Sequence, residues 1–192
     1  MIIDLSIPIS EETPLYPDDP PVNIKLWAVI DRDGYYMNVI KMGEHTGTHV
    51  DAPAHFIAEG KTVDELPLEK FVGEGLVLDV RGGEGEVKLE EIPDSGYFDR
   101  VVLFLTNGRE LSPEVALFLV AEGAKAVGID AMSIGDEAVH KILLSAEVPI
   151  FENLANLEEL LEKEFTFIAF PLKIEGGSGS PVRAVAMLHS DD

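Results

Sequence analysis

Between residues 101 and 153, short apolar runs alternate with segments of helical periodicity. The run VVLFL is apolar and partly β-branched, which is typical of a buried strand. The next segment has the signals of a helix. Ser112 is a favourable N-cap residue, Pro113 is favourable at the first helical position, and Gly123 is favourable at the C-terminal end of the helix. The predicted elements are a strand at 101–105, a helix at 112–123, a strand at 124–130, a helix at 136–146 and a strand at 148–153. This order predicts a layer of parallel strands.

The rest of the chain has a different pattern. Three alternating or β-branched runs, separated by Pro and Gly clusters, predict antiparallel or mixed strands at 2–7, 22–29 and 36–42. Two more predicted strands, at 165–174 and 180–188, bracket the glycine-rich stretch EGGSGS. No repeat or linker divides the sequence. We therefore expect an α/β fold with a mixed sheet, in a single domain over residues 1–192.

Composition and charge argue against several classes of binding partner. The chain has 14 Lys and Arg against 36 Asp and Glu, a net charge of −22, so nucleic acid and anionic membranes are poor partners. The longest apolar run, 115–121, is far shorter than the roughly 20 residues that span a bilayer. The first residues lack a basic segment and contain Asp4, which argues against export, so we expect a cytoplasmic protein that acts on a small molecule.

Histidines concentrate in the stretch HTGTHVDAPAHF at 45–56, which holds three of the five in the chain. On an extended strand His45, His49 and Asp51 fall on one face, together with Gly47. A flat strand would place the two histidine Cα atoms about 13 Å apart, near the limit for sharing one ion. We therefore expect a bend or bulge at Gly47.

The residue types in this stretch predict a metal site. Cysteine is absent, so any metal must be held by nitrogen and oxygen. Imidazole with carboxylate suits Zn, Mn or Fe better than Ca or Mg, and we take zinc as the default, with Mn as an alternative. His55 follows Pro53 and so leaves the strand, which makes it a better candidate for proton transfer than for metal binding.

Residues elsewhere in the chain could add a second metal position. His140 lies on the predicted helix 136–146, and Glu152 lies at the end of the predicted strand 148–153, where α/β sheets usually place ligands. Taken alone, a residue of either type is more often an ordinary surface residue than a ligand. His189 lies near the end of the chain and is interpreted as structural or solvent-exposed.

Several motifs together resemble a known family, the cyclase-like metal-dependent hydrolases, which include bacterial kynurenine formamidase and isatin hydrolase. The motifs are HTGTHVDAPAHF, DLSIPISEETPLYPDDPP, GIDAMSIG, HKILLSAEVPIFENL and FPLKIEGGSGSPVRAVA, in this order along most of the chain. The resemblance implies a swivelling β/β/α fold, usually assembled as a dimer or tetramer.

The resemblance also implies a centre of two metal ions. Residues matching His45, His49 and Asp51 bind one ion, and Asp51 bridges to a second ion held by His140 and Glu152. The residue matching His55 is the catalytic acid and base. Ser178 departs from the pattern, since an acidic residue is expected there in kynurenine formamidases, and this departure concerns substrate identity more than metal binding.

The leading hypothesis is hydrolysis of a small aromatic amide, such as N-formylkynurenine in tryptophan catabolism, by metal-activated water. His55 would protonate the departing aryl amine. Trp27, Tyr35 and Phe56 are candidates for an aromatic pocket, although core packing is the commoner role for any one such residue. A cyclic amide or lactone of the isatin type is the alternative substrate class.

Two other functions stay open at this point. AMSIG at 131–135 could be a variant nucleophile elbow, with Ser133 as nucleophile and His189 as its base. This leaves the cluster at 45–55 unexplained. The protein could also be a non-catalytic metal-binding protein, and His55 separates this possibility from an enzyme, because metal binding needs no proton donor beside the ions.

Overall fold

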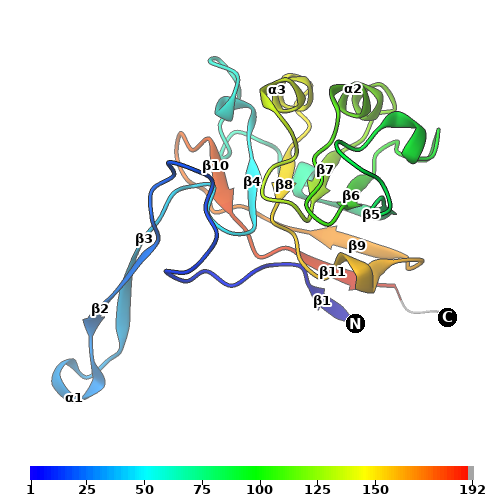
Figure 1. Ribbon diagram of the computed structural model, residues 1–192. Helices are drawn as coiled ribbons and strands as arrows, with labels where there is room; N and C mark the ends of the chain where they lie inside the picture. Colours follow the sequence, from blue (N-terminus) through cyan, green and yellow to red (C-terminus); the bar gives the residue numbers. More distant parts are fainter. Residues whose placement is uncertain (190–192) are drawn as a thin grey trace.

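The computed structural model describes residues 1–189 and contains a curled mixed sheet (Figure 1). Four central strands run parallel in the order β5 (Val72–Asp79), β6 (Val101–Leu105), β7 (Ala126–Ile129) and β8 (Ile150–Glu152). Helices α2 (Pro113–Ala121) and α3 (Glu137–Ser145) connect the last three of these strands. The predicted layer of parallel strands is therefore confirmed.

Antiparallel strands extend the sheet at both sides. Beyond β5 lie β9 (Phe165–Ile168), β11 (Val185–Leu188) and β1 (Ile2–Asp4). Beyond β8 lie β4 (His49–Asp51) and β10 (Gly179–Pro181). Nine strands within residues 1–189 thus form the main sheet, ordered β1-β11-β9-β5-β6-β7-β8-β4-β10. The N-terminal strand pairs with the C-terminal one.

Both faces of β6 are covered, which explains why its sequence is apolar at every position. Val102 and Phe104 belong to a core that includes residues of α2 and α3, the helices on one face of the sheet (Figure 1). Val101 and Leu103 belong to a second core, shared with β9, β11 and β1. The sheet curls so that these outer strands pack back against its own centre.

The helix boundaries follow the capping signals in the sequence. Ser112 accepts a hydrogen bond from the backbone N–H of Val115 at 3.4 Å, and Pro113 begins α2 as predicted. Asp136 caps α3 in the same way, through the N–H of Val139 at 3.0 Å. Short 3₁₀ turns complete the helical structure at η1 (Pro53–His55), η2 (Leu68–Phe71), η3 (Leu89–Glu91) and η4 (Leu157–Leu160).

A two-stranded hairpin projects from the body of the molecule (Figure 1). It consists of β2 (Asn23–Ala28) and β3 (Met37–Lys41), joined through the single-turn helix α1 (Ile30–Asp33). The strands are antiparallel, as their alternating sequence predicted. None of the helices within residues 1–189 is long and apolar enough to cross a membrane.

Two parts of the sheet differ from the sequence-based expectation. Strand β5 was not predicted, because Gly73 and Gly75 interrupt its apolar pattern. Gly75 is required there, since a Cβ atom would lie 1.9 Å from the Phe165 ring. The single strand expected at 180–188 is two strands, β10 and β11, which pair with different partners.

Candidate metal centre

The pairing of β4 with β8 places the first candidate ligands side by side. The two strands are antiparallel, and their register sets His49 directly opposite Glu152. Asp51 lies two residues further along β4, on the same face of the strand. Helix α3 brings His140 to this end of the sheet, where its Nε2 lies 3.3 Å from Oε1 of Glu152. Segments about a hundred residues apart in sequence thus meet.

Gly47 provides the bend that brings His45 to the same place. Its φ of +65° lies in the left-handed region that favours glycine. The regular strand begins only at His49, so His45 does not lie on it, and the imidazoles of His45 and His49 have their centroids 5.2 Å apart and perpendicular planes. The expected bend at Gly47 is therefore confirmed.

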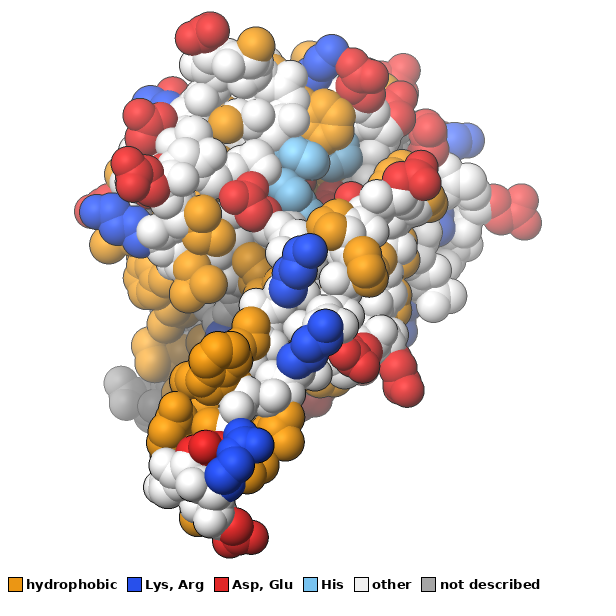
Figure 2. Space-filling model, turned by 90° about the vertical axis from the view of Figure 1, so that its left-hand side faces the viewer, with side chains coloured by type: hydrophobic (Ala, Val, Ile, Leu, Met, Phe, Trp, Pro, Cys, Tyr) orange, Lys and Arg blue, Asp and Glu red, His pale blue; other side chains and the backbone are white. Residues whose placement is uncertain are grey.

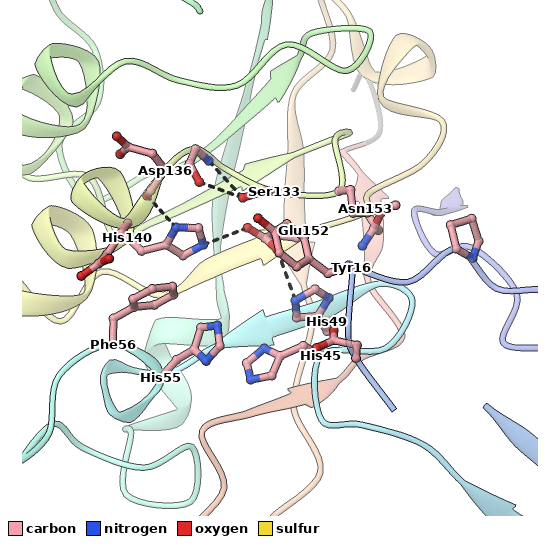
Figure 3. Close-up of a pocket in the computed structure, with 15 residues that line it drawn as sticks. Tyr16, His45, His49, His55, Phe56, Ser133, Asp136, His140, Glu152 and Asn153 are labelled. Carbon is pink, nitrogen blue, oxygen red and sulfur yellow. Dashed lines mark hydrogen bonds and ion pairs between the residues drawn. The ribbon is translucent and has the colours of Figure 1, made fainter. Parts of the chain in front are cut away.

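Four side chains converge on Asp51: His45, His49, His140 and Glu152, which Figure 3 shows gathered in one place. One potential ligand group consists of His45, His49 and Asp51, and a second of Asp51, His140 and Glu152, with the donor atoms of each group all within 4.8 Å of one another. Asp51 Oδ1 lies 2.7 Å from His45 Nδ1 and 3.3 Å from His49 Nε2. Its Oδ2 lies 3.6 Å from His140 Nε2. The geometry permits Asp51 to bridge two ions.

Backbone carbonyls orient two of the imidazoles. His49 Nδ1 lies 2.9 Å from the carbonyl oxygen of Gly47, and His140 Nδ1 lies 2.9 Å from that of Asp136. A carbonyl oxygen only accepts, so Nδ1 carries the proton in both rings. In the neutral rings, Nε2 then faces the carboxylates of Asp51 and Glu152 as a lone pair. Metal-binding histidines are held in this way by partners on the outer nitrogen.

The electrostatics of the cluster suit a cation. Asp51 is fully buried, and its Oδ2 is the one buried side-chain oxygen or nitrogen within residues 1–189 without a hydrogen-bond partner. Burial would raise the pKa of Asp51, but hydrogen bonds from His45 and His49 outweigh it and hold the pKa well below its usual value. For His49, burial opposes protonation, but bonds to Asp51 and Glu152 raise its pKa to about 10.

The pKa of His140 is also raised, because its bond to Glu152 outweighs the opposing effect of burial. Protons on the imidazoles therefore balance the buried carboxylates when no metal is bound. A divalent cation can replace these protons, which is the usual exchange at histidine and carboxylate sites. The three imidazoles, the two carboxylates and the unpartnered oxygen of Asp51 fit such an ion.

His55 lies beside this cluster but belongs to neither ligand group. It ends the 3₁₀ turn η1, and its ring stacks on that of His45 with centroids 3.9 Å apart. Partial desolvation by the surrounding rings lowers its pKa, although the nearby carboxylate of Asp51 opposes this effect. His55 is therefore neutral at neutral pH and can both accept and donate a proton.

A cavity of about 300 Å³ opens onto the cluster. The imidazoles of His45, His49, His55 and His140 line it, and Phe56 packs against His140 with ring centroids 4.5 Å apart (Figure 3). Figure 2 shows histidine side chains, in pale blue, in a hollow of the surface. Tyr16 lies at the cavity as well. The cavity can hold a small aromatic molecule next to the ligand groups.

The expected aromatic pocket is only partly right. Phe56 lines the cavity, but Trp27 and Tyr35 do not. Both lie in the projecting hairpin, with exposed fractions of 62% and 51%. Tyr16, from the stretch TPLYPDDPP, takes part instead. Sequence reasoning missed it, since a lone tyrosine in a proline-rich loop carries no local signal of its position.

The structure separates Ser133 from its supposed base. Ser133 lines the metal-site cavity, but its hydroxyl donates to the carbonyl oxygen of Gly135 at 2.8 Å. His189 follows β11, and its Nε2 lies 2.9 Å from the hydroxyl of Thr166. No hydrogen bond joins Ser133 to a histidine in the part of the chain that the structure describes. This geometry does not support a serine nucleophile, and it agrees with a structural role for His189.

Comparison with known proteins extends these observations. Residues 3–136 match the family model described as "Putative cyclase". A kynurenine formamidase from Bacillus anthracis is 30% identical over 200 residues, covering 95% of each chain. One from Salinibacter ruber is 33% identical over 204 residues, covering 96% of each.

Solved structures give the same result. Isatin hydrolase A from Labrenzia aggregata, bound to benzyl benzoate, aligns with a TM-score of 0.87 and 28% identity, covering 99% of this chain and 94% of that one. Family match, near full-length relatives and fold all agree with the resemblance noted in the sequence. The chain belongs to the cyclase family of metal-dependent hydrolases.

Proposed function

We propose that this protein hydrolyses a small aryl amide, with an arylformamide such as N-formylkynurenine as the leading substrate. The observation that carries the proposal is the cluster around Asp51, in which imidazole nitrogens face two buried carboxylates at the floor of a cavity. The relatives named kynurenine formamidase support the substrate class. Such a substrate would place the protein in tryptophan catabolism.

The metal ligands in this proposal are the five residues of the cluster. His45, His49 and Asp51 would hold one ion, and Asp51, His140 and Glu152 a second. We propose zinc, with manganese as the alternative, because imidazole and carboxylate ligands suit both. A divalent ion polarises a carbonyl group and lowers the pKa of a bound water from 15.7 toward about 7.

The protein groups around the ligands keep the cluster in place. The backbone N–H of Ile134 donates to Oε1 of Glu152 at 2.7 Å, which fixes the carboxylate at the end of β8. The side-chain amide of Asn153 donates to the carbonyl oxygen of Gly47 at 3.1 Å, the same oxygen that accepts from His49. Little reorganisation is then needed when substrate arrives.

His55 is the proposed acid and base. As a neutral ring beside the cluster, it can take a proton from the attacking water and transfer it to the departing aryl amine. Water adds to the formyl carbon, the carbon–nitrogen bond breaks, and formate and the free amine leave. Phe56 offers an aromatic surface for the substrate ring.

A cyclic amide of the isatin type is the second candidate substrate. The likeness to isatin hydrolase A supports it, since that protein has nearly the same fold over the whole chain. The chemistry at the ligands would be the same, except that the ring opens and no fragment leaves. Ser178, where an acidic residue was expected for kynurenine formamidases, also fits this alternative.

We further propose that the protein is a homodimer and that the hairpin is the contact surface. Eight large hydrophobic side chains of this segment are exposed: Leu26, Trp27, Ile30, Tyr35, Tyr36, Met37, Val39 and Ile40. Figure 2 shows hydrophobic side chains along the projecting hairpin. Apolar side chains gathered on a protruding segment mark an interaction site in soluble proteins.

Elemental analysis and a substrate panel test the function. The purified protein should contain zinc or manganese, and it should hydrolyse N-formylkynurenine and simple aryl formamides faster than isatin. Chelation should abolish turnover, and the added metal should restore it. Turnover that persists after complete metal removal would refute the proposal, whereas faster isatin hydrolysis would favour the second substrate class.

A further inference from the structure

The glycine-rich loop at 175–179 is a part of the site to which the proposed mechanism gives no role. It precedes β10, which pairs with β4, so the loop passes next to the ligand segment. The carbonyl oxygen of Ser178 accepts from the N–H of Ala52 at 2.9 Å, and that of Gly177 accepts from the N–H of Val63 at 2.8 Å. These bonds fix the loop against the chain that carries the metal ligands.

Ser178 connects His45 to a carboxylate outside the ligand groups. Its hydroxyl oxygen lies 2.9 Å from Nε2 of His45 and 2.7 Å from Oε2 of Glu44. The backbone N–H of Ser178 donates to the same Glu44 oxygen at 2.9 Å. Glu44 therefore accepts two hydrogen bonds from one residue, while its sequence neighbour His45 contacts the other side of that residue.

The directions of these bonds follow from the number of protons available. A serine hydroxyl has one proton, and a carboxylate oxygen accepts, so the Ser178 proton is used toward Glu44. The hydroxyl oxygen must then accept from His45, which requires a proton on Nε2 of that ring. Nδ1, which donates to Asp51 at 2.7 Å in this structure, is then the nitrogen whose proton a metal can replace.

The His45 ring is also confined sterically. A Cβ atom on Gly179 would lie 2.6 Å from Cε1 of His45, so only glycine allows the ring this position. The stacked ring of His55 contacts His45 as well. The ring plane is thus restricted by its neighbours, and the hydrogen bond to Ser178 selects which nitrogen faces Asp51.

His45 differs in this respect from the two other imidazoles of the cluster. His49 and His140 donate to backbone carbonyls, those of Gly47 and Asp136, which no substitution can remove. Among these three rings, His45 alone has a side chain, that of Ser178, as the partner of its outer nitrogen. Its orientation therefore depends on residue identity at positions 178 and 44.

We propose that Ser178 and Glu44 are positioning residues that hold His45 with Nδ1 toward Asp51 and so set the affinity of the first metal position. Glu44 acts through Ser178, by keeping the serine hydroxyl oriented as an acceptor for His45. The inference rests on the metal centre of the proposed function.

Metal affinity of purified, metal-free protein tests the proposal. Zinc binding is measured by competition with a chelating dye in wild type, Ser178→Ala and Ser180→Ala. Ser180→Ala is the matched control, since that hydroxyl is buried two residues further along the chain but bonds to Leu172 and Pro181. Ser178→Ala should lower the affinity for one of the two zinc ions by about 10- to 100-fold. Ser180→Ala should leave both affinities unchanged.

A double-mutant cycle isolates the contribution of Glu44. Glu44→Ala should lower the affinity for the same zinc ion. The Glu44→Ala, Ser178→Ala double variant should bind this ion no more weakly than Ser178→Ala alone, because Glu44 acts only through the serine. Additive losses would show two independent effects and would overturn the proposed pair.

Nitrogen-15 NMR of the imidazoles in the zinc-loaded protein gives a readout that a general loss of packing would not produce. The His45 ring should show a protonated Nε2 in wild type, with slow exchange of that proton, and faster exchange in Ser178→Ala. A protonated Nδ1 in wild type would overturn the inference.

The outcomes also separate this inference from the proposed function. Wild-type protein that binds neither zinc nor manganese would refute both. Wild-type protein that binds two zinc ions, with equal affinities in Ser178→Ala and Ser180→Ala, would refute the positioning role and leave the hydrolase proposal intact.

Discussion

The metal cluster and the projecting hairpin depart from the usual distribution of side chains in opposite directions. Around Asp51, charged and polar side chains are buried. The exposed fractions of His49, Asp51 and Glu152 are 3%, 0% and 5%. Along β2 and β3, large apolar side chains are exposed, including Trp27 at 62% and Leu26 at 58%. Buried charge and exposed apolar surface are both costly in an isolated chain.

The comparison shows that each region favours binding, but of different partners. The cluster can replace protons with a divalent cation, which neutralises its carboxylates. The hairpin can lower its free energy only by covering its apolar faces with another apolar surface. The two regions can therefore be disrupted separately, and the following predictions are ordered from the largest expected effect to the smallest.

Asp51→Ala should have the largest effect, because both ligand groups contain this residue. Both metal ions should be lost, and turnover of an aryl formamide should fall by at least about 10³-fold. Asp4→Ala is the control, since Asp4 pairs with Arg183 at an edge of the sheet. Metal content and turnover are measured for both. A metal-loaded, active Asp51→Ala protein would contradict the shared-ligand arrangement.

His55→Ala should reduce turnover by about 10²- to 10⁴-fold and leave metal content unchanged, because the residue transfers protons and lies outside both ligand groups. His189→Ala serves as the comparison, since that ring bonds only to Thr166 on the far strand. Steady-state kinetics and elemental analysis decide the outcome. Unchanged turnover in His55→Ala would favour a binding protein or another acid.

Charges on the hairpin should affect assembly and leave the metal site intact. Leu26 and Ile40 lie on one face of the hairpin, since Ile40 pairs with Ile24, two residues before Leu26. The double substitution Leu26→Glu, Ile40→Glu should weaken the dimer by about 100-fold or more. Sedimentation analysis measures this, with Leu117→Glu on the exposed face of α2 as control. Wild-type protein that sediments as a monomer would disprove the hairpin contact.

Two glycines with similar backbone angles allow the finest comparison. Gly34, at the end of α1, has φ +79°, and Gly47 has φ +65°. Alanine at either position adds left-handed strain of roughly 1–2 kcal/mol. At Gly34 a Cβ meets no atom within 4 Å, whereas at Gly47 it lies 3.3 Å from the side chain of Ile9.

Gly34→Ala should therefore affect only the hairpin, seen as faster hydrogen exchange there with normal zinc affinity. Gly47→Ala should shift His45 and His49 and lower zinc affinity by about tenfold. If both variants bind zinc with the affinity of wild type, the backbone conformation at Gly47 does not determine the positions of His45 and His49.

The sequence predicted elements whose signals are local. The strand predicted at 101–105 and the helix predicted from Ser112 and Pro113 agree with the structure. Their signals, a continuous apolar run and a set of capping residues, are each contained in a few adjacent residues. The bend at Gly47 was predicted for the same reason. Strand β5 was missed, since Gly75 has a packing role against Phe165 that no local pattern reveals.

The site was predictable only in part. His45, His49 and Asp51 lie within seven residues, and their types and spacing alone indicated a metal site. His140 and Glu152 were left open by spacing and joined to the cluster only through the family resemblance, because the pairing of β4 with β8 is set by long-range packing. The same limit explains the wrong placement of Trp27 and Tyr35 in the pocket.

The position of β10 has a consequence for the order of events during synthesis. The strand that flanks β4 comes from residues 179–181, and β1 finds its sheet partner only in residues 185–188. The ribosome must therefore release residues 175–188 before the loop that holds His45 can close. A nascent chain stalled before residue 178 should accordingly elute from a zinc column earlier than the chain that includes these residues.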